Sequence, residues 1–178
     1  FAVGEVAGTH GVYRPGGSAL NSGQVGSTRA AQYIWDNCKG EPAEIKDYSY
    51  INNKIELIEK IVNNTGEPNV LQLRKAIGDR MSKHGAHIRS LEGLKSVLEE
   101  AKKDLQNVDK QVLANIYELP LAVNNIDLLI AQITYASAMI DYIEKGGGSR
   151  GSYLIGEGNS FMDMVQEVEY KNGEVAAF

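Results

Sequence analysis

The 178-residue chain is poor in cysteine and in positive charge, and each shortage excludes a class of protein. Its single cysteine, Cys38, cannot build an internal disulfide framework or a cysteine-based metal cluster, and it suits a reducing compartment such as the cytoplasm. Its 18 Lys and Arg against 23 Asp and Glu leave a net charge of −5, so we expect no nucleic-acid partner. No stretch approaches the unbroken apolar length that crosses a membrane, so we expect no direct membrane span.

Glycine is concentrated at the start of the chain, whereas the rest is patterned for helices. Seven of the 19 glycines fall within the first 26 residues. Further along, apolar residues recur at three- and four-residue spacing, which is typical of amphipathic helices. We expect helices over residues 18–37, 48–64, 68–85, 91–105 and 110–145.

Individual residues indicate where these helices begin and end. Ser18 or Asn21 can cap the first helix, and Ser90 can cap the fourth. Pro120 is expected to kink or split the fifth helix, because proline removes a backbone donor and clashes with the preceding turn. The expected core stripes are Ile51, Ile55, Ile58 and Val62; Val70, Leu73, Ile77 and Met81; Leu91, Leu94, Leu98, Ala101 and Leu105; and Leu129, Ile133, Ile140 and Ile143.

The end of the chain changes its period. Residues 165–170 and 174–178 alternate by two around Asn172 and Gly173, which predicts a β-hairpin. The expected fold is therefore mainly α, with a bundle of three to four helices over residues 46–150. Residues 1–40 precede the bundle as a separate part, and residues 151–178 form a tail with the hairpin.

The first 20 residues combine features of a ligand-binding segment. A short apolar stretch predicts a strand that ends at Gly4 and Glu5, and a glycine-rich loop with His10 and Arg14 follows it. A helix rich in small residues then opens at Ser18. Such an arrangement offers a carboxylate at a strand end, backbone that can approach a ligand closely, and unpaired amides at a helix start.

This loop resembles the flavin- and substrate-binding loop of the succinate dehydrogenase and fumarate reductase flavoprotein family. Residues 10–20 read HGVYRPGGSAL, where the family usually has HGANRLGGNSL after an apolar strand and Gly-Glu. A second segment, SRGSY at residues 149–153, resembles the family's ESRGAH, and residues 73–105 resemble its C-terminal helical domain. L-aspartate oxidase and adenylylsulfate reductase flavoproteins belong to the same group, so the substrate stays open.

The resemblance implies the C-terminal part of a FAD-dependent oxidoreductase. Hydride would pass between flavin N5 and a carboxylate-bearing substrate. Glu5 would accept hydrogen bonds from the ribityl chain of FAD, and the amides of Ser18, Ala19 and Leu20 would face the N1 and O2 side of the flavin. Arg14 would hold the substrate carboxylate with two parallel hydrogen bonds. His10 is a weaker catalytic candidate beside the flavin.

Each of these residues also has a structural interpretation. Glu5 can be an exposed carboxylate at a strand end, and Arg14 can be a surface residue in a Gly/Pro turn. The helix start at Ser18 can be an ordinary terminus, and His10 can be a hydrogen-bonded loop residue.

Other polar residues are assigned structural roles. His84 and His87 lie three apart, but no third ligand accompanies them, so capping or solvated side chains are expected and no metal site. Arg150 is expected to tie the helical domain to the flavin domain.

The chain also departs from the family pattern. Tyr13, Pro15 and Ser18 stand where the family has Asn, Leu and Asn, which leaves specificity for succinate or fumarate open. The dinucleotide fingerprint Gly-x-Gly-x-x-Gly is missing, so we expect the chain to be part of a longer protein and inactive alone.

The implied partners are a small carboxylate substrate, the rest of the FAD domain and an electron-transfer subunit. That subunit would give a cytoplasmic protein a membrane association. The alternative interpretation is a non-catalytic helical scaffold or subunit-interaction domain.

Overall fold

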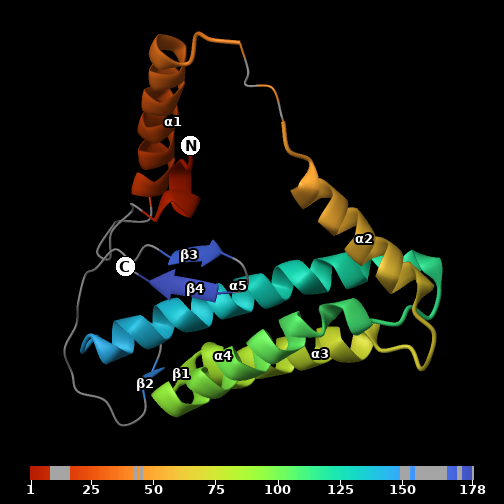
Figure 1. Cartoon of the computed structure of the whole chain (residues 1–178). Helices are drawn as coiled ribbons and strands as arrows, with labels where there is room; N and C mark the ends of the chain where they lie inside the picture. Colours follow the sequence, from red (N-terminus) through yellow and green to blue (C-terminus); the bar gives the residue numbers. More distant parts are fainter. Residues whose placement is uncertain are drawn as a thin grey trace. The chain divides into compact units, whose positions relative to one another are not determined.

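The computed structural model describes residues 1–8, 17–41, 44, 46–148, 153–154, 168–171 and 174–177. These residues are mainly helical, with five α-helices (Figure 1). The chain divides into two compact units, the first comprising Phe1–Lys46 and the second beginning at Asp47. Helix α1 belongs to the first unit, and the other four helices belong to the second.

Among its described residues, the first unit has one α-helix, α1 (Ser18–Asn37), and the N-terminal segment lies along it. The expected strand is wrong: Val3 has an extended backbone, but Gly4 turns at a φ of 75° and Gly4–Ala7 forms a short 3-10 helix, η1. A strand needs a neighbouring strand to receive its backbone hydrogen bonds, and the described part of this unit contains none. The turn at Gly4 lets the segment pack against α1 instead.

Small residues of α1 make this packing close. A Cβ added at Gly26 would lie 3.8 Å from Val3 Cβ, and one added at Gly23 would lie 3.8 Å from Gly4 Cα. Phe1 continues along the helix, with its ring centroid 5.5 Å from that of Tyr33. These two glycines of α1 therefore lie against the chain's own N-terminal segment.

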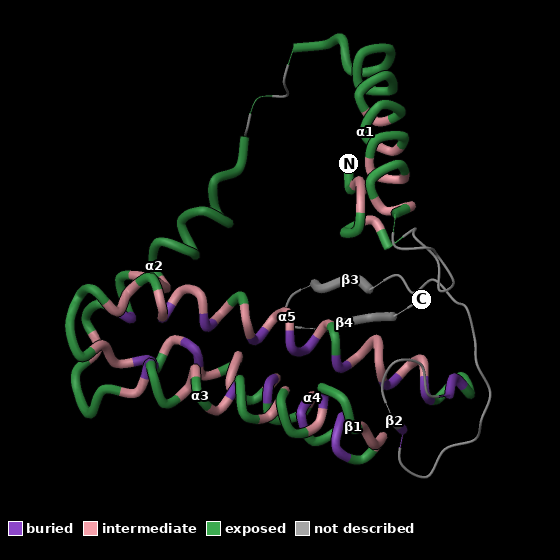
Figure 2. The backbone as a smooth tube through the Cα atoms, turned by 180° about the vertical axis from the view of Figure 1, so that it is seen from behind, coloured by how far each residue is buried: buried purple, intermediate pink, exposed green. Residues whose placement is uncertain are grey.

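The second unit is built around three helices, α3 (Val70–Arg80), α4 (Leu91–Gln106) and α5 (Leu119–Glu144). Helix α5 lies along both α3 and α4, and buried residues gather on their facing sides (Figure 2). Ser90 caps α4 as expected, since its Oγ accepts a hydrogen bond from the Gly93 amide at 3.1 Å. The expected bundle is confirmed at this level.

The apolar stripes of these three helices form the core. Two clusters of buried residues lie between them: Ile77, Ala101, Val108, Leu129 and Ile133 in the first, and Leu94, Ile140, Ile143 and Leu154 in the second. A third cluster joins the C-terminal end of helix α2 (Ser49–Asn63) to the bundle through Ile61, Val70 and Ala122. The stripes predicted for α3, α4 and α5 are thus the ones that pack.

The stripe predicted for helix α2 (Ser49–Asn63) is wrong. Ile51, Ile55 and Val62 are 46%, 48% and 41% exposed, and Ile61 is the buried residue of this helix. The C-terminal end of α2 packs against α5 and the 3-10 turn Val108–Lys110, while the rest is largely exposed (Figure 2). Only that end contributes to the core, because no other described helix runs along the remainder of the stripe.

The fifth predicted helix begins later than expected. Residues 111–115 are irregular and Ile116–Glu118 form a 3-10 turn, so α5 starts at Leu119 with Pro120 in its first turn. The predicted kink is therefore wrong: the first turn of a helix tolerates proline because its amides have no intrahelical acceptor. The helix ends before Gly146, which has a φ of 87°.

The helical segment Ile116–Glu144, which includes α5, is long and apolar enough to cross a membrane, judged by length and composition alone. This corrects the expectation that no stretch reaches that length. The core helix of a helical bundle meets the same criterion, and α5 buries Leu129, Ile133 and Ile140 in the interior. The absence of a membrane span remains a proposal.

Short strands complete the described part of the second unit. β1 (Ile88–Arg89) pairs in parallel with β2 (Tyr153–Leu154). β3 (Val168–Lys171) pairs antiparallel with β4 (Glu174–Ala177), and both lie against α5 (Figure 1). Asn172 and Gly173, expected to form the turn, lie outside the described residues.

Candidate functional site

The residues expected to contact a flavin lie in the first unit. Glu5 belongs to η1 and is exposed, and its backbone carbonyl accepts a hydrogen bond from the Gly8 amide at 3.0 Å. Its position at a 3-10 turn replaces the predicted strand end. The carboxylate nevertheless remains accessible to a ligand.

Ser18, Ala19 and Leu20 form the first turn of α1. The helix begins at Ser18 after Gly17, so neither Ser18 nor Asn21 is the N-cap, and Gly17 has no side chain to cap the first amides. Amides in a first helical turn lack acceptors within their own helix, and the positive end of the helix dipole lies there. The dipole at this end of α1 therefore favours an electron-rich group nearby.

The fold brings these two elements to the same end of α1. Gly4 lies against Gly23, which is one turn beyond the first turn of the helix, so η1 is beside the start of α1 (Figure 1). Glu5 supplies an acceptor and the helix start supplies donors.

The other residues expected at this site cannot be placed. His10 and Arg14 lie outside the described residues, as does Arg150 of the second motif. Their roles remain predictions from the sequence.

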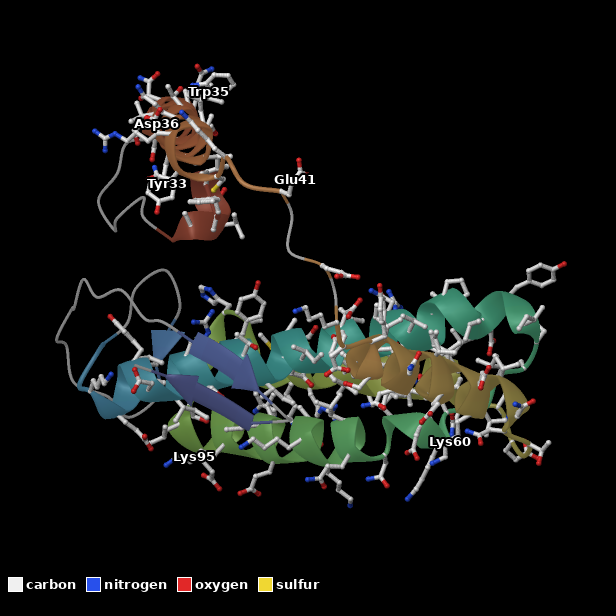
Figure 3. All side chains as sticks on the ribbon, turned by 45° about the horizontal axis from the view of Figure 1, so that its top comes forward. Tyr33, Trp35, Asp36, Glu41, Lys60 and Lys95 are labelled. Atoms are coloured by element: carbon white, nitrogen blue, oxygen red, sulfur yellow. The ribbon has the colours of Figure 1, made fainter. Side chains whose placement is uncertain are left out.

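Apolar side chains are exposed on the same helix. None of the residues of α1 in the described structure is buried, and Leu20 and Trp35 are 79% and 77% exposed. Trp35 and Asp36 project away from α1 near its C-terminal end (Figure 3). Large exposed apolar side chains gathered on one element are typical of a surface that another protein segment covers.

A separate pocket of about 380 Å³ lies within the second unit. It is here called the Arg89 pocket and is lined by Met81, Gly85, Arg89, Tyr135, Ala138, Met139, Tyr142, Ile143, Gly148 and Leu154. Ligand pockets typically range from about 300 to 1,000 Å³ and have mainly apolar walls with a few polar groups. The Arg89 pocket has both properties.

An irregular turn shapes one wall of this pocket. After α3 the chain continues as a π-helix, Met81–Gly85, a wider helix that often marks functional sites. Gly85 packs directly against the Met81 side chain, since a Cβ added at Gly85 would lie 2.5 Å from Met81 Sδ. The turn therefore places Met81 and Gly85 together in the wall.

Arg89 is anchored by that same turn. Its Nε donates to the carbonyl oxygens of Gly85 at 3.0 Å and Ala86 at 2.7 Å. Partial burial lowers the pKa of the Arg89 guanidinium, which still stays charged at working pH. No carboxylate among the described residues forms an ion pair with Arg89.

The two histidines near this turn have different surroundings. His84 is half-buried, and a Cβ added at Gly93 would lie 2.6 Å from its Nδ1, so its ring covers the start of α4. His87 is exposed. Within the described residues no three His, Cys, Asp or Glu side chains gather in a group that could hold a metal ion.

Sequence reasoning did not single out Arg89. A signal was present in Gly85 and Ala86, which interrupt the helical pattern directly before Arg89 and the Ser90 cap. A glycine between two apolar stripes indicates a turn, but the π-helix and the pocket depend on contacts with α5.

No protein-family model matches the chain, and no curated protein matches it either.

Proposed function

We propose that this chain is the C-terminal part of a FAD-dependent oxidoreductase similar to the succinate dehydrogenase and fumarate reductase flavoproteins. Residues 1–40 would be the end of its FAD-binding domain, and residues 46–150 its helical domain. Hydride would pass between flavin N5 and a carboxylate-bearing substrate held by Arg14. The tail would end in a hairpin closed at Asn172 and Gly173.

The observation that carries this proposal is the segment HGVYRPGGSAL at residues 10–20, preceded by Gly4 and Glu5. The geometry of the first unit is compatible with it, because Glu5 and the first turn of α1 lie at one end of the helix. In this proposal Glu5 accepts hydrogen bonds from the ribityl hydroxyls. The amides of Ser18 to Leu20 stabilise negative charge on the reduced flavin.

The exposure of α1 also supports an incomplete domain. None of the described residues of α1 is buried, so this helix contributes little to a core of its own. Its exposed side chains nevertheless include the apolar residues Val25, Ile34 and Trp35. Burial of such side chains is the main favourable term in folding. The remainder of a FAD domain would supply the missing contacts.

A second candidate function is favoured by α2. Its stripe of Ile51, Ile55 and Val62 is exposed, and Tyr50 on the same helix is exposed too. An amphipathic helix that leaves its apolar side uncovered is a common docking element between proteins. A scaffold or subunit-interaction domain without flavin is therefore the alternative.

Flavin content separates the two functions. The complete gene product that contains this chain should retain FAD through gel filtration, measured by flavin absorbance and by chromatography of the released cofactor. The 178-residue chain alone should not retain it, since half a site leaves cofactor surface in water. A complete product free of flavin would favour the scaffold function.

A substitution tests the role of Glu5. Glu5→Gln removes a charged acceptor, and a hydrogen bond to a charged group contributes about 1.5–3 kcal/mol, so FAD affinity should fall by about tenfold or more. Glu67→Gln is a matched control, because Glu67 is an exposed carboxylate on the second unit. Equal FAD affinities in the two variants would remove Glu5 from the site.

A further inference from the structure

The Arg89 pocket contains a cation that the described structure does not neutralise. Arg89 uses its Nε for the Gly85 and Ala86 carbonyls, and no other hydrogen bond of its guanidinium is formed within the described residues. The Nη1 and Nη2 end of the group therefore keeps its donors. A planar guanidinium with two parallel N–H groups matches the geometry of a carboxylate.

The rest of the wall selects for an apolar body on the ligand. Ala138, Met139 and Ile143 come from one face of α5, and Met81 faces them from the π-helix. Methionine side chains adapt to ligand shape and make favourable contacts with aromatic rings. Tyr135 and Tyr142 add aromatic surface with a polar hydroxyl at the edge.

We propose that the Arg89 pocket binds a small organic carboxylate with an aromatic or branched apolar body. The guanidinium of Arg89 holds the carboxylate, and the side chains of α5 and Met81 enclose the body. The site lies wholly in the second unit and needs no flavin, so it is independent of the proposed oxidoreductase site in the first unit.

Pre-organisation supports this assignment. The two carbonyl contacts at 3.0 and 2.7 Å hold the Arg89 side chain before a ligand arrives. Less side-chain freedom is then lost on binding, which favours affinity. The incoming carboxylate also compensates a guanidinium that has already lost part of its hydration.

Titration of the 178-residue chain with phenylacetate and with its neutral analogue phenylacetamide, followed by NMR, tests the proposal. Phenylacetate should bind saturably and shift signals of Gly85, Arg89 and Ala138. Phenylacetamide should bind at least tenfold more weakly, because it lacks the charge. Succinate should also bind more weakly, because it lacks the apolar body. The absence of saturable phenylacetate binding would overturn the proposal, as would equal affinity for the acid and the amide.

Variants assign the binding to this pocket. Arg89→Gln should weaken phenylacetate at least tenfold, and Ala138→Leu should weaken both aromatic probes by filling the cavity. Arg74→Gln is the matched control: Arg74 donates to Asn124 and does not line the pocket, so affinity should be unchanged. Unchanged binding in Ala138→Leu would overturn the assignment. The comparison of acid with amide decides the charge requirement even if Arg89→Gln fails to fold.

Discussion

Asn125 donates a hydrogen bond to Gln111 inside the second unit, with Nδ2 2.9 Å from Oε1. Both side chains are buried, at 0% and 2% exposure. Asn125 Nδ2 also donates to the Val70 carbonyl at 3.0 Å, and Gln111 Nε2 donates to the carbonyls of Val108 and Ala122. This pair satisfies backbone acceptors from α3, α5 and the segment between α4 and α5.

Replacing Asn125 with Asp should destabilise the protein increasingly as the pH rises. The new carboxylate would face two acceptors, the Val70 carbonyl and Gln111 Oε1, in a buried site, so its pKa in the folded state is raised. A raised folded pKa means that stability is lost as the pH rises above the unfolded value of about 4. Urea unfolding between about pH 4 and pH 8 measures this trend.

The neighbouring residue provides the control for that substitution. Asn124 Oδ1 accepts from Arg74 Nη1 at 2.7 Å, so Asn124→Asp places a carboxylate beside a guanidinium. Its effect at pH 8 should stay within about 1 kcal/mol and be neutral or stabilising. Equal destabilisation in the two variants would contradict the role given to the buried amide pair.

Arg80 should contribute more to stability than other cations of the same helix. Its side chain is 13% exposed, and Nη1 lies 2.7 Å from Asp104 Oδ2 while Nη2 lies 3.2 Å from Gln132 Oε1. Arg80→Met should lower the free energy of unfolding by about 1.5–3 kcal/mol, because hydrogen bonds to a charged group are lost and Gln132 loses a partner.

Lys75→Met is the comparison for Arg80→Met. Lys75 pairs with Asp79 on the exposed side of α3, with side chains 76% and 64% exposed. Such surface pairs contribute little, so the change should be within about 0.5 kcal/mol. Chemical denaturation measures the free energy of unfolding of both variants. Equal losses of this free energy would contradict the account.

Helix positions in the second unit were largely predictable from the sequence, whereas its buried amides were not. Ser90, Gly146 and the three- and four-residue stripes are local signals, and local signals determine where helices begin, end and face. Asn125, Gln132 and Gln111 are buried because carbonyls distant in sequence need donors, and no short-range pattern contains that information. The burial predicted for the α2 stripe was wrong for the same reason. A stripe predicts which side of a helix is apolar, but it does not say which segment covers that side.

The Lys60 and Asp109 ion pair should make stability depend on pH. The hydrogen bond from Lys60 on α2 (Figure 3), with smaller contributions from nearby charges, lowers the pKa of the Asp109 carboxyl. A carboxyl with a depressed folded pKa stabilises the protein above its unfolded pKa of about 3.9, and this contribution is lost as the pH falls through the folded value. Because both side chains are partly exposed, the contribution should be below about 1 kcal/mol.

Asp109→Asn measures that contribution. Its free energy of unfolding should be lower than that of the unsubstituted chain at pH 7, and the difference should shrink below about pH 4. Glu99→Gln, on the exposed side of α4, should show no such dependence. A difference between the Asp109 variant and the unsubstituted chain that is constant with pH would contradict the ion pair's role.

Gly26 should accept alanine but not a large side chain. A Cβ there would contact Val3 Cβ at 3.8 Å, an ordinary separation, and alanine favours helix by about 1 kcal/mol over glycine. Gly26→Ala should therefore increase α1 helicity and keep the Phe1 and Tyr33 ring contact. Gly26→Phe should displace the N-terminal segment, whereas Ala31→Phe, at an exposed position, should not. Ring-proton NOEs between Phe1 and Tyr33 report the outcome.

The expected strand before Glu5 was wrong, because its neighbours along the chain did not reveal what it packs against. The expected strand required a sheet, whereas the described residues place a 3-10 turn against Gly23 and Gly26. The Arg89 pocket was not expected, because its walls come from the π-helix Met81–Gly85, α5 and short strands that are far apart along the chain. Contacts between distant segments set that site.

The flavin chemistry itself is tested most directly by Arg14→Lys in the complete gene product. Flavin reduction or reoxidation by succinate, fumarate and L-aspartate would be followed anaerobically by stopped-flow absorbance, with flavin content measured in parallel. Lysine keeps the charge but loses the planar fork, so the rate should fall by about a hundredfold, roughly 3 kcal/mol, with FAD retained. Arg29→Lys, on the exposed surface of α1, should leave the rate unchanged. Near-normal turnover in Arg14→Lys, or no exchange of electrons with any of these carboxylates, would contradict the proposed function.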